Sequence, residues 1–490
     1  MNRDVFEKLK AEGYNRIPVY RSVLADLDTP LSVYLKLADG PDAYLLESVE
    51  GGETWGRFSI IGLPCTRRFA LRGTTLTVTE VGADVREEEV ADPLDFVARL
   101  QQEFRAPRLE QLPVFTGGLV GYFGYELVQR FEPRLAEGDK PDQIGTPEMV
   151  LLQSEEVAVF DNLAGRLYLV VNVDPGAGGA WDAAQARLDE LAHRLRSSGL
   201  GYGETVSRPS VAEQDYDYGF SRRDFIAAVE RCKEYILAGD IFQVVLSQRM
   251  SVPFAARPLD VYRALRALNP SPYMYFIDLG DTQIVGSSPE VLVRVQQRRV
   301  TLRPIAGTRR RGETAEEDRR LETELLADPK ERAEHLMLID LGRNDVGRVA
   351  RTGSVEVTDT MIIERYSHVM HIVSQVEAEL AEGLTAADAI RSAFPAGTLS
   401  GAPKIRAMEI IGELEPVRRN VYAGAVGYLN WNDDTDLAIA IRTAVIKDGM
   451  LHVQAGAGIV ADSDPEKEWE ESMNKGRALI AAVNSASMGL

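Results

Sequence analysis

The sequence predicts an α+β protein, a large two-layer body of mainly antiparallel β-sheets with helices outside. The 490 residues exceed the size of roughly 250–300 residues at which one hydrophobic core usually stops growing. Hydrophobic residues make up 45% of the chain and charged residues 27%, as in ordinary soluble globular proteins. Strand-like segments also follow one another along the chain, which favours antiparallel pairing.

The first half shows apolar and polar alternation interrupted by glycines, then helical and strand-like stretches. The elements predicted there are strands within 33–80, a helix at 92–105, strands at 148–160 and 165–173 and a helix at 180–198. Residues 200–218 are rich in Gly, Ser, Asp and Tyr with little apolar periodicity, which is typical of a linker. We therefore divide the chain into regions 15–200 and 221–485, joined by a linker at 201–220.

The second half mixes helices and strands in the same way. The predicted helices are 221–238, 257–267, 315–342, 385–393, 402–412 and 464–485, and the predicted strands are 241–249, 273–278, 283–286, 291–295, 422–429, 436–446 and 451–460. Neither a dinucleotide fingerprint in its strand-turn-helix context nor a phosphate-binding P-loop occurs.

Composition also restricts the partners and the compartment. A formal net charge of −20 repels nucleic-acid backbones and anionic membranes. The two cysteines, Cys65 and Cys232, lie far apart without metal-ligand spacing, which suits a reducing compartment. No signal-peptide pattern and no apolar run of membrane-spanning length is present. We therefore expect a cytoplasmic protein.

Two predicted helices carry paired carboxylates. Glu331 and Glu334 are three residues apart, as are Glu468 and Glu471, so each pair lies on one helix face. Together they could offer the oxygen ligands that Mg²⁺ prefers. Glutamates at this spacing are also common on solvated helix faces.

Three further features have both a functional and an ordinary reading. His368 and His371 could be acid/base groups or satisfied core residues. The small-residue loop 394–404 could bind an anion at a helix N-terminus or could be a capped turn. Arg442, on a predicted strand, could hold a carboxylate or form a surface ion pair.

Five motifs together are more specific than any one of these features. They are Asp240–Arg249, Pro304–Arg309, Glu334–Asp345, Ala396–Lys404 and Gly456–Val460. In this order the motifs resemble those of the chorismate-utilising enzymes, and among these of the anthranilate synthase component I group. The resemblance is dense from about 221 to 482 and thinner in the first half.

The resemblance implies a reaction and a site. Mg²⁺ would be held by Glu334 and Glu471, with Glu331 and Glu468 in support. Chorismate would be bound by Gly307, Thr308, Tyr422, Arg442, Gly456, Ala457 and Gly458, and the catalytic residues would be Glu290, His371, Thr398 and Lys475. Ammonia would add at C2 while the C4 hydroxyl leaves, with Glu290 as the acid, and His371 would serve the loss of pyruvate.

Two positions favour anthranilate synthase over its relatives. Water-using relatives carry a lysine where this chain has Gln243, and aminodeoxychorismate synthases carry one where it has Ala306. Neither side chain can act as a base or an attacking amine. The alternatives are an aminodeoxychorismate synthase component I and a catalytically silent tryptophan-sensing subunit.

The resemblance also implies partners and control. Neither cysteine has the context of a glutaminase nucleophile, so a glutamine amidotransferase subunit would supply ammonia within a hetero-oligomer, a heterotetramer by the family pattern. The first half resembles a region that binds tryptophan as the feedback inhibitor of the first step of tryptophan biosynthesis. The inhibitor residues would be Glu47, Ser48, Arg57, Pro272, Tyr273, Met274, Val426 and Tyr428. This N-terminal regulatory part would pack on the catalytic part.

Overall fold

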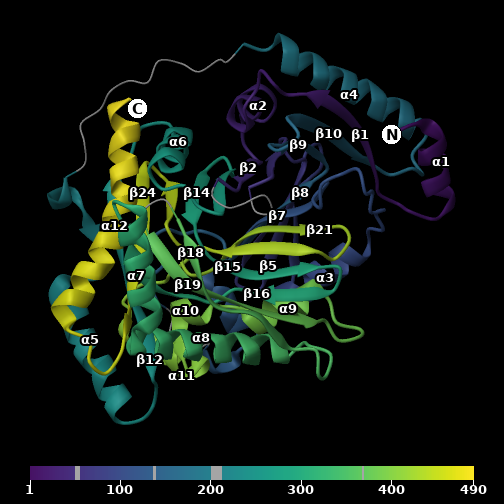
Figure 1. The fold of residues 1–490 in the computed structure, drawn as a ribbon. Coiled ribbons are helices and arrows are strands. Elements are labelled where there is room, and N and C mark those ends of the chain that lie inside the picture. The colour runs from purple at the N-terminus through teal and green to yellow at the C-terminus, as the bar shows by residue number, and fades with distance from the viewer. Residues whose placement is uncertain (50–55, 136–139, 200–211, 367–368, 490) are drawn as a thin grey trace.

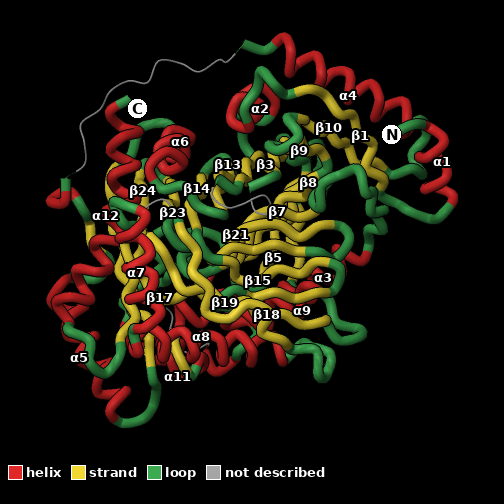
Figure 2. Tube along the Cα trace, viewed as in Figure 1, coloured by secondary structure: helices red, strands yellow, loops and turns green. Residues whose placement is uncertain are grey.

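Two large antiparallel sheets form the body of the protein. The computed structural model describes residues 1–49, 56–135, 140–199, 212–366 and 369–489. Each sheet has twelve strands, and neighbouring strands run antiparallel. The strands gather in the interior and the helices lie outside them (Figure 2). The α+β class with mainly antiparallel sheets is thus confirmed.

The first sheet contains strands from both halves of the chain, which meet where β2 pairs with β13. In spatial order its strands are β1 (Ile17–Leu24), β10 (Arg166–Val173), β9 (Glu156–Asp161), β3 (Phe58–Gly62), β2 (Ala43–Glu47), β13 (Tyr273–Asp278), β14 (Thr282–Ser288), β23 (Thr443–Lys447), β24 (Met450–Ile459), β12 (Gln243–Pro253) and β11 (Asp217–Tyr218), with β20 (Gly401–Ala402) paired to β12.

The second sheet is shared in the same way, and its halves meet where β21 pairs with β7. In spatial order its strands are β17 (Ile305–Arg310), β19 (Val369–Glu379), β16 (Arg299–Leu302), β15 (Val291–Gln296), β22 (Thr435–Ile439), β21 (Ala425–Asn430), β7 (Gly118–Phe123), β8 (Met149–Ser154), β4 (Arg67–Arg72), β5 (Thr75–Glu80) and β6 (Arg86–Glu89), with β18 (Glu356–Arg365) paired to β19.

The helices cover the outer faces of the sheets. They are α1 (Arg3–Ala11), α2 (Pro30–Leu37), α3 (Pro93–Gln102), α4 (Ala180–Ser197), α5 (Arg222–Leu237), α6 (Pro258–Leu268), α7 (Ala315–Ala327), α8 (Pro329–Gly347), α9 (Ala386–Ala393), α10 (Gly397–Ser400), α11 (Lys404–Leu414) and α12 (Pro465–Met488), with 3₁₀ turns at Tyr125–Arg130, Pro133–Leu135 and Glu213–Asp215. Helix α4 packs on β10 and β1, and α12 packs on β24 at the opposite side of the molecule (Figure 1). Among the described residues, none of the helices combines the length and the apolar character that crossing a bilayer requires.

Two apolar clusters join the two halves; the second contains Tyr122 and Tyr275, and the first is the larger and is called the main core. The main core includes Val19 and Leu169 of the first half and Leu246 and Ala457 of the second, each fully buried. A much smaller cluster stands apart from it, made of Leu321 and Leu325 of α7 and Met370 and Ile372 of β19. The edge of the second sheet at β17–β19 therefore has its own packing against α7.

Several predicted boundaries are wrong for local reasons. The helix predicted at 315–342 is two helices, because Asp328 caps the amides of Lys330 and Glu331 and Pro329 starts the second helix. The strand predicted at 436–446 is interrupted at Arg442, which has a φ of +49°. Helix α2 begins at Pro30 and extends into the stretch read as strands, because Thr29 caps it.

The long β18–β19 hairpin was not predicted, and the linker is only partly described. Residues 212–220 hold a 3₁₀ turn and the short strand β11, whereas 201–211 of the predicted linker lie outside the described residues. Because both sheets run through both halves, the regions 15–200 and 221–485 are continuous with each other in each sheet. The division itself stays a prediction.

Candidate active site

A cavity of about 640 Å³ collects most of the predicted site residues. Strands β12, β17 and β24 and helices α8, α10 and α12 contribute to its lining. All the predicted catalytic, substrate-binding and metal-binding residues line it except His371 and Ala457. Segments more than 180 residues apart in the sequence, from Glu290 to Lys475, thus meet at one place. The individual roles stay predictions.

Ala457 points away from the cavity because side chains alternate along a strand. It is fully buried in the main core, between two glycines whose backbone faces the cavity. A Cβ on Gly458 would lie 2.6 Å from Gln243 Nε2, and one on Gly456 would lie 2.6 Å from the carbonyl oxygen of Leu246. These two glycines leave room for the neighbouring polar groups, and Lys475 Nζ donates to the carbonyl of Gly456 at 3.0 Å.

The four glutamates face the cavity from two capped helices. Asp464 caps α12 and Pro465 starts it, as Asp328 and Pro329 do for α8. Burial raises the pKa of Glu334, and the nearby charges of Glu331 and Glu471 raise it further. Burial also raises the pKa of Glu468, with Glu471 adding to the effect. The carboxylates of the two helices are thus close enough to repel one another.

Basic and amide groups engage three of these carboxylates. Arg309 Nη1 donates to Glu331 at 3.0 Å, Lys475 pairs with Glu471 at 2.8 Å and Gln243 Nε2 donates to Glu334 at 3.4 Å. Across the described ranges, no three His, Cys, Asp or Glu side chains converge tightly enough to hold a metal ion among them. Mg²⁺ needs only one or two protein carboxylates besides water and substrate oxygens. The oxygen donors of Glu334 and Glu471 fit that requirement.

Glu290 is a buried carboxyl group in the same cavity. It lies between β14 and β15 and is only 8% exposed. Burial raises its pKa to about 8, against the opposing effects of a hydrogen bond from Thr398 and the charge of Arg442. Thr398 Oγ1 donates to Glu290 Oε1 at 3.0 Å. Glu290 is therefore mostly protonated at neutral pH and can donate a proton.

Arg442 lies between β22 and β23 and not within a strand as predicted. Its left-handed backbone conformation is uncommon for a residue with a Cβ, and such strain persists only where the surroundings impose it. The carbonyl of Arg442 accepts from the amide of Ser287 at 3.1 Å. Its side chain lines the cavity beside Glu290 and supplies positive charge there.

His371 stands directly behind the cavity lining. On β19 it is paired with Thr308 of β17, next to an irregularity in register at Gly307. Its Nδ1 lies 3.0 Å from the carbonyl oxygen of Gly307 and 3.1 Å from Thr308 Oγ1. Nδ1 donates to the carbonyl, so Nε2 carries the lone pair. Burial lowers the pKa of His371, which keeps it neutral and able to accept a proton. His368 lies outside the described residues.

Sequence reasoning missed the groups that hold the lining in place. Beneath Val245, Leu399 and Tyr422 lies a buried ion pair, Arg419–Glu415, at 2.6 Å. Arg419 donates to the carbonyls of Leu399 and Val245 at 2.7 and 2.8 Å and packs over the ring of Tyr422. We call these five residues the floor of the cavity. The spacing of Glu415 and Arg419 in the sequence is compatible with pairing, but no local pattern indicates that they lie under a cavity.

The opposite side of the cavity is formed by Gly307 and Thr308, backed by α7, β18 and β19. We call β17, β18, β19 and α7 together the wall. Arg309, which follows Thr308, donates to Glu324, Asp328 and Glu331 and so ties β17 to the junction of α7 and α8. The Pro304–Arg309 motif contained this residue, but its partners come from later helices.

The predicted inhibitor residues lie on both sheets, away from the cavity lining. Glu47 is opposite Met274 in the β2–β13 ladder and accepts from Tyr262 and Arg266. Residues Ser48 and Pro272 flank the same two strands. Two further predicted inhibitor residues lie on β21: Val426 is buried and Tyr428 is half-buried.

Asp436 connects the two sheets at this place. Tyr273 of the first sheet donates to Asp436 of the second at 2.8 Å, and Arg294 pairs with Asp436 at 2.7 Å. Tyr428 is opposite Asp436 in the β21–β22 ladder. Arg57, by contrast, forms an ion pair with Asp161 of β9 at 2.8 Å. Seven of the eight predicted inhibitor residues thus lie on or directly next to β2, β13 or β21, whereas Arg57 is bonded to Asp161 of β9.

The sequence and the fold both match known chorismate enzymes. Residues 53–481 match the family described as chorismate binding enzyme. The chain is 58% identical over 484 residues to anthranilate synthase component 1 of Pseudomonas putida, covering 99% of this chain and 98% of the relative. It is 52% identical to the component 1 protein of Neisseria meningitidis serogroup B, over 100% and 99% of the two chains.

Solved structures agree with this match. The crystal structure of anthranilate synthase component I from Streptococcus pneumoniae TIGR4 superposes with a TM-score of 0.78 at 38% identity, covering 94% of this chain and 99% of that one. The isochorismate synthase MenF from Escherichia coli shares the fold, with a TM-score of 0.70 at 18% identity over 98% of each chain. The chain therefore belongs to the chorismate-binding enzymes and, within them, to the anthranilate synthase component I group.

Proposed function

We propose that this enzyme aminates chorismate at C2 with ammonia and then eliminates pyruvate to give anthranilate, in a reaction that requires Mg²⁺. The observation that carries the proposal is the protonated Glu290 in the same cavity as the four glutamates, Arg442 and the backbone of Gly456 and Gly458. Arg442 and a Mg²⁺ ion held by the glutamates would supply positive charge for anionic chorismate within a chain of strongly negative net charge.

Different residues of the cavity serve different steps of the proposed reaction. Arg442 holds the enolpyruvyl carboxylate, and Glu290 donates its proton to the C4 hydroxyl, which leaves as water while ammonia forms the C2–N bond. His371, neutral with Nε2 as acceptor, then removes the C2 proton. The ammonium formed at C2 first returns one proton to Glu290. The C3–O bond then breaks as the C2 proton leaves, the enolate of pyruvate departs and is protonated on its terminal carbon, and the ring becomes aromatic.

Glu334 and Glu471 would hold Mg²⁺, with Glu331 and Glu468 in support. When bound, the ion supplies a local positive charge that holds the ring carboxylate and stabilises negative charge on the substrate. The separation of the two glutamate pairs on two helices suits such an ion, because Mg²⁺ keeps coordination positions for substrate and water.

Gln243 and Ala306 both line the cavity, so neither of the two positions that carry a lysine in relatives offers an amine here. We therefore favour free ammonia as the nucleophile. Burial raises the pKa of Cys232 to about 12 and that of Cys65 also rises. Both thiols stay protonated and are poor nucleophiles, so we assign glutamine hydrolysis to a separate amidotransferase subunit. We assign feedback inhibition by tryptophan to the β2–β13 and β21 residues.

The test is product identification with chorismate, Mg²⁺ and an ammonium salt. We expect fluorescent anthranilate and an equal amount of pyruvate; an aminated product without pyruvate would favour the aminodeoxychorismate alternative. Glu334→Gln should abolish the Mg²⁺-dependent rate while the exposed Asp340→Asn on the same helix should not. Added tryptophan should slow the wild type, and binding of tryptophan without any consumption of chorismate would leave only the sensor alternative.

A further inference from the structure

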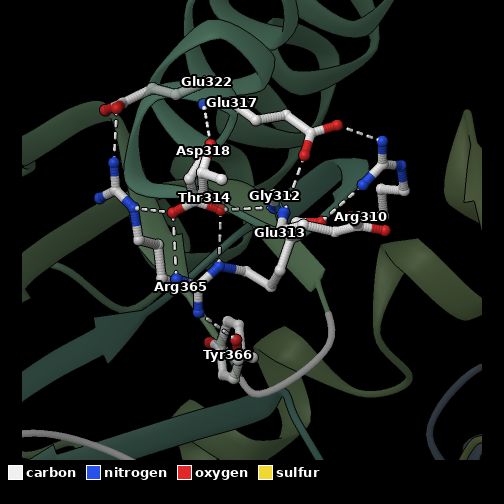
Figure 3. Close-up of polar contacts among 10 residues, drawn as sticks. Arg310, Gly312, Glu313, Thr314, Glu317, Asp318, Glu322, Arg365 and Tyr366 are labelled. Carbon is white, nitrogen blue, oxygen red and sulfur yellow. Dashed lines mark hydrogen bonds and ion pairs between the residues drawn. The ribbon is translucent and has the colours of Figure 1, made fainter.

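A carboxylate on α7 gathers an unusual number of donors outside the cavity. Asp318 is 7% exposed and accepts from Arg311 Nε at 2.9 Å, Arg311 Nη2 at 3.0 Å, the amide of Gly312 at 2.8 Å and Arg365 Nε at 3.1 Å. Figure 3 shows Gly312 and Arg365 converging on Asp318 from separate segments. Charge-assisted contacts of this kind with two-pronged guanidinium geometry are strong and directional.

Each arginine reaches beyond Asp318. Arg311 Nη1 donates to the carbonyl of Tyr366 at 2.8 Å, and Arg365 Nη2 donates to Glu322 of α7 at 2.5 Å. We call Asp318, Arg311, Arg365 and Gly312 the clasp. It joins three parts of the wall: the segment after β17, the first turns of α7 and the end of the β18–β19 hairpin.

The wall needs such polar contacts because its apolar packing is small. Beside the clasp, only Leu321, Leu325, Met370 and Ile372 are buried in a separate cluster, whereas Val376 and Ala378 farther along β19 belong to the main core. Because the clasp holds three chain segments together, it strongly influences how the elements of the wall are arranged.

Two of the groups that contact His371 are linked to the clasp. The ring of Tyr366 meets the imidazole edge to face, with centroids 5.4 Å apart, and the carbonyl of Tyr366 is held by Arg311. The other neighbour is the carbonyl of Gly307 on β17, and that strand leads into Gly312, whose amide binds Asp318. The imidazole is thus contacted from two sides by groups that the clasp links to Asp318.

We propose that Asp318, acting through Arg311, is a positioning residue that orients His371 for the pyruvate-eliminating step and has no direct contact with substrate. This inference rests on the proposed function, because it takes the role of His371 from there. A misaligned imidazole slows removal of the C2 proton, while amination, which uses Glu290 between β14 and β15, continues. The aminated intermediate then leaves before pyruvate is lost.

The experiment compares the products of the full-length enzyme and its variants by chromatography. Asp318→Asn keeps the volume and removes the charge, and Arg311→Lys keeps a charge but cannot hold both Asp318 and Tyr366 in one fork. Both variants should release a severalfold larger fraction of aminated intermediate than the wild type. Glu317→Gln is the matched control, since the Glu317 carboxylate accepts from Arg310 and the amide of Glu313, whereas Arg311 donates to Asp318 and Tyr366 (Figure 3).

The reference variant His371→Ala separates the two ways of failing. If His371→Ala gives only anthranilate, the role of His371 in the proposed function is wrong. If His371→Ala releases intermediate and both clasp variants give wild-type product ratios, the positioning role of Asp318 is overturned. A fall in melting temperature with an unchanged product ratio also overturns it, since that result assigns the clasp to stability alone. If Asp318→Asn does not fold, Arg311→Lys decides the question by the same ratio.

Discussion

The floor and the wall of the cavity are stabilised in opposite ways. Within the floor, the side chains of Arg419 and Glu415 are at most 2% exposed and are paired to each other, next to residues of the main core. In the wall, Asp318 meets Arg311 and Arg365, whose side chains are 34% and 37% exposed, and the apolar cluster is separate and small. A conformational change in the floor would therefore also disturb the main core, whereas the wall near the clasp can change conformation locally.

This difference separates two tasks of one site. The floor carries Leu399 and Tyr422 and supports Thr398, which binds Glu290, the proposed proton donor. The wall carries Thr308 and His371, and the second step of the proposed reaction would use His371. A change in the floor should therefore lower stability and both steps together, while a change in the wall should alter the balance between steps.

The largest effect is expected from Arg419→Met. The variant leaves Glu415 buried without its partner, and breaking a buried pair in this way costs about 3–5 kcal/mol. Chemical denaturation should show a lower free energy of unfolding, and the overall rate should fall with it. The double variant Arg419→Met/Glu415→Gln should recover part of the stability. Wild-type stability in the single variant would contradict the description of the floor.

A second large effect is expected from Glu290→Gln, which keeps an acceptor for Thr398 but removes the acidic proton. Loss of a general acid lowers the rate by about 10²–10⁴-fold. In the wild type, activity should fall as pH rises through about 8, where Glu290 loses its proton. Steady-state rates between pH 6 and 10 measure this limb, and a rate constant that stays level to pH 10 would exclude Glu290 as the acid.

Glu290 also makes stability depend on pH in a defined direction. Its pKa is about 8 in the folded protein against 4.5 for an ordinary glutamate, so between these values the folded state binds a proton that the unfolded chain has lost. Its contribution to stability is fully present below pH 4.5 and is lost as pH rises to about 8. The Glu290→Gln variant should lack this part of the decline.

The smallest effect is expected from Ile372→Val in the wall. Ile372 is fully buried in the separate cluster, and the loss of one buried methylene group costs about 0.5–1.5 kcal/mol. Because the cluster around Ile372 is separate from the main core, hydrogen exchange should become faster in α7 and in the part of β19 around Ile372 but not in α11. Equal acceleration in α11 would show that floor and wall are one cooperative unit.

Much of the site could be predicted because its elements are local. The pairs Glu331/Glu334 and Glu468/Glu471 lie on helices as their spacing indicates, and Gly456 and Gly458 lie on a strand. The break between α7 and α8 was also encoded locally, in Asp328 and Pro329, but the helical periodicity on both sides concealed it. The β18–β19 hairpin escaped prediction because its strands have mixed exposure and no clear turn signal.

By itself, the sequence determined the helices that carry the acidic pairs, the family motifs and the absence of a lysine at positions 243 and 306, since these depend on residue type and short-range periodicity. Tertiary structure alone decided that both sheets run through both halves, that Arg442 leaves its strand and that Arg311 and Arg419 bind carbonyls far away in the chain. Such contacts follow from strand register and burial across hundreds of residues, where each polar group takes whichever partner the folded chain brings within reach.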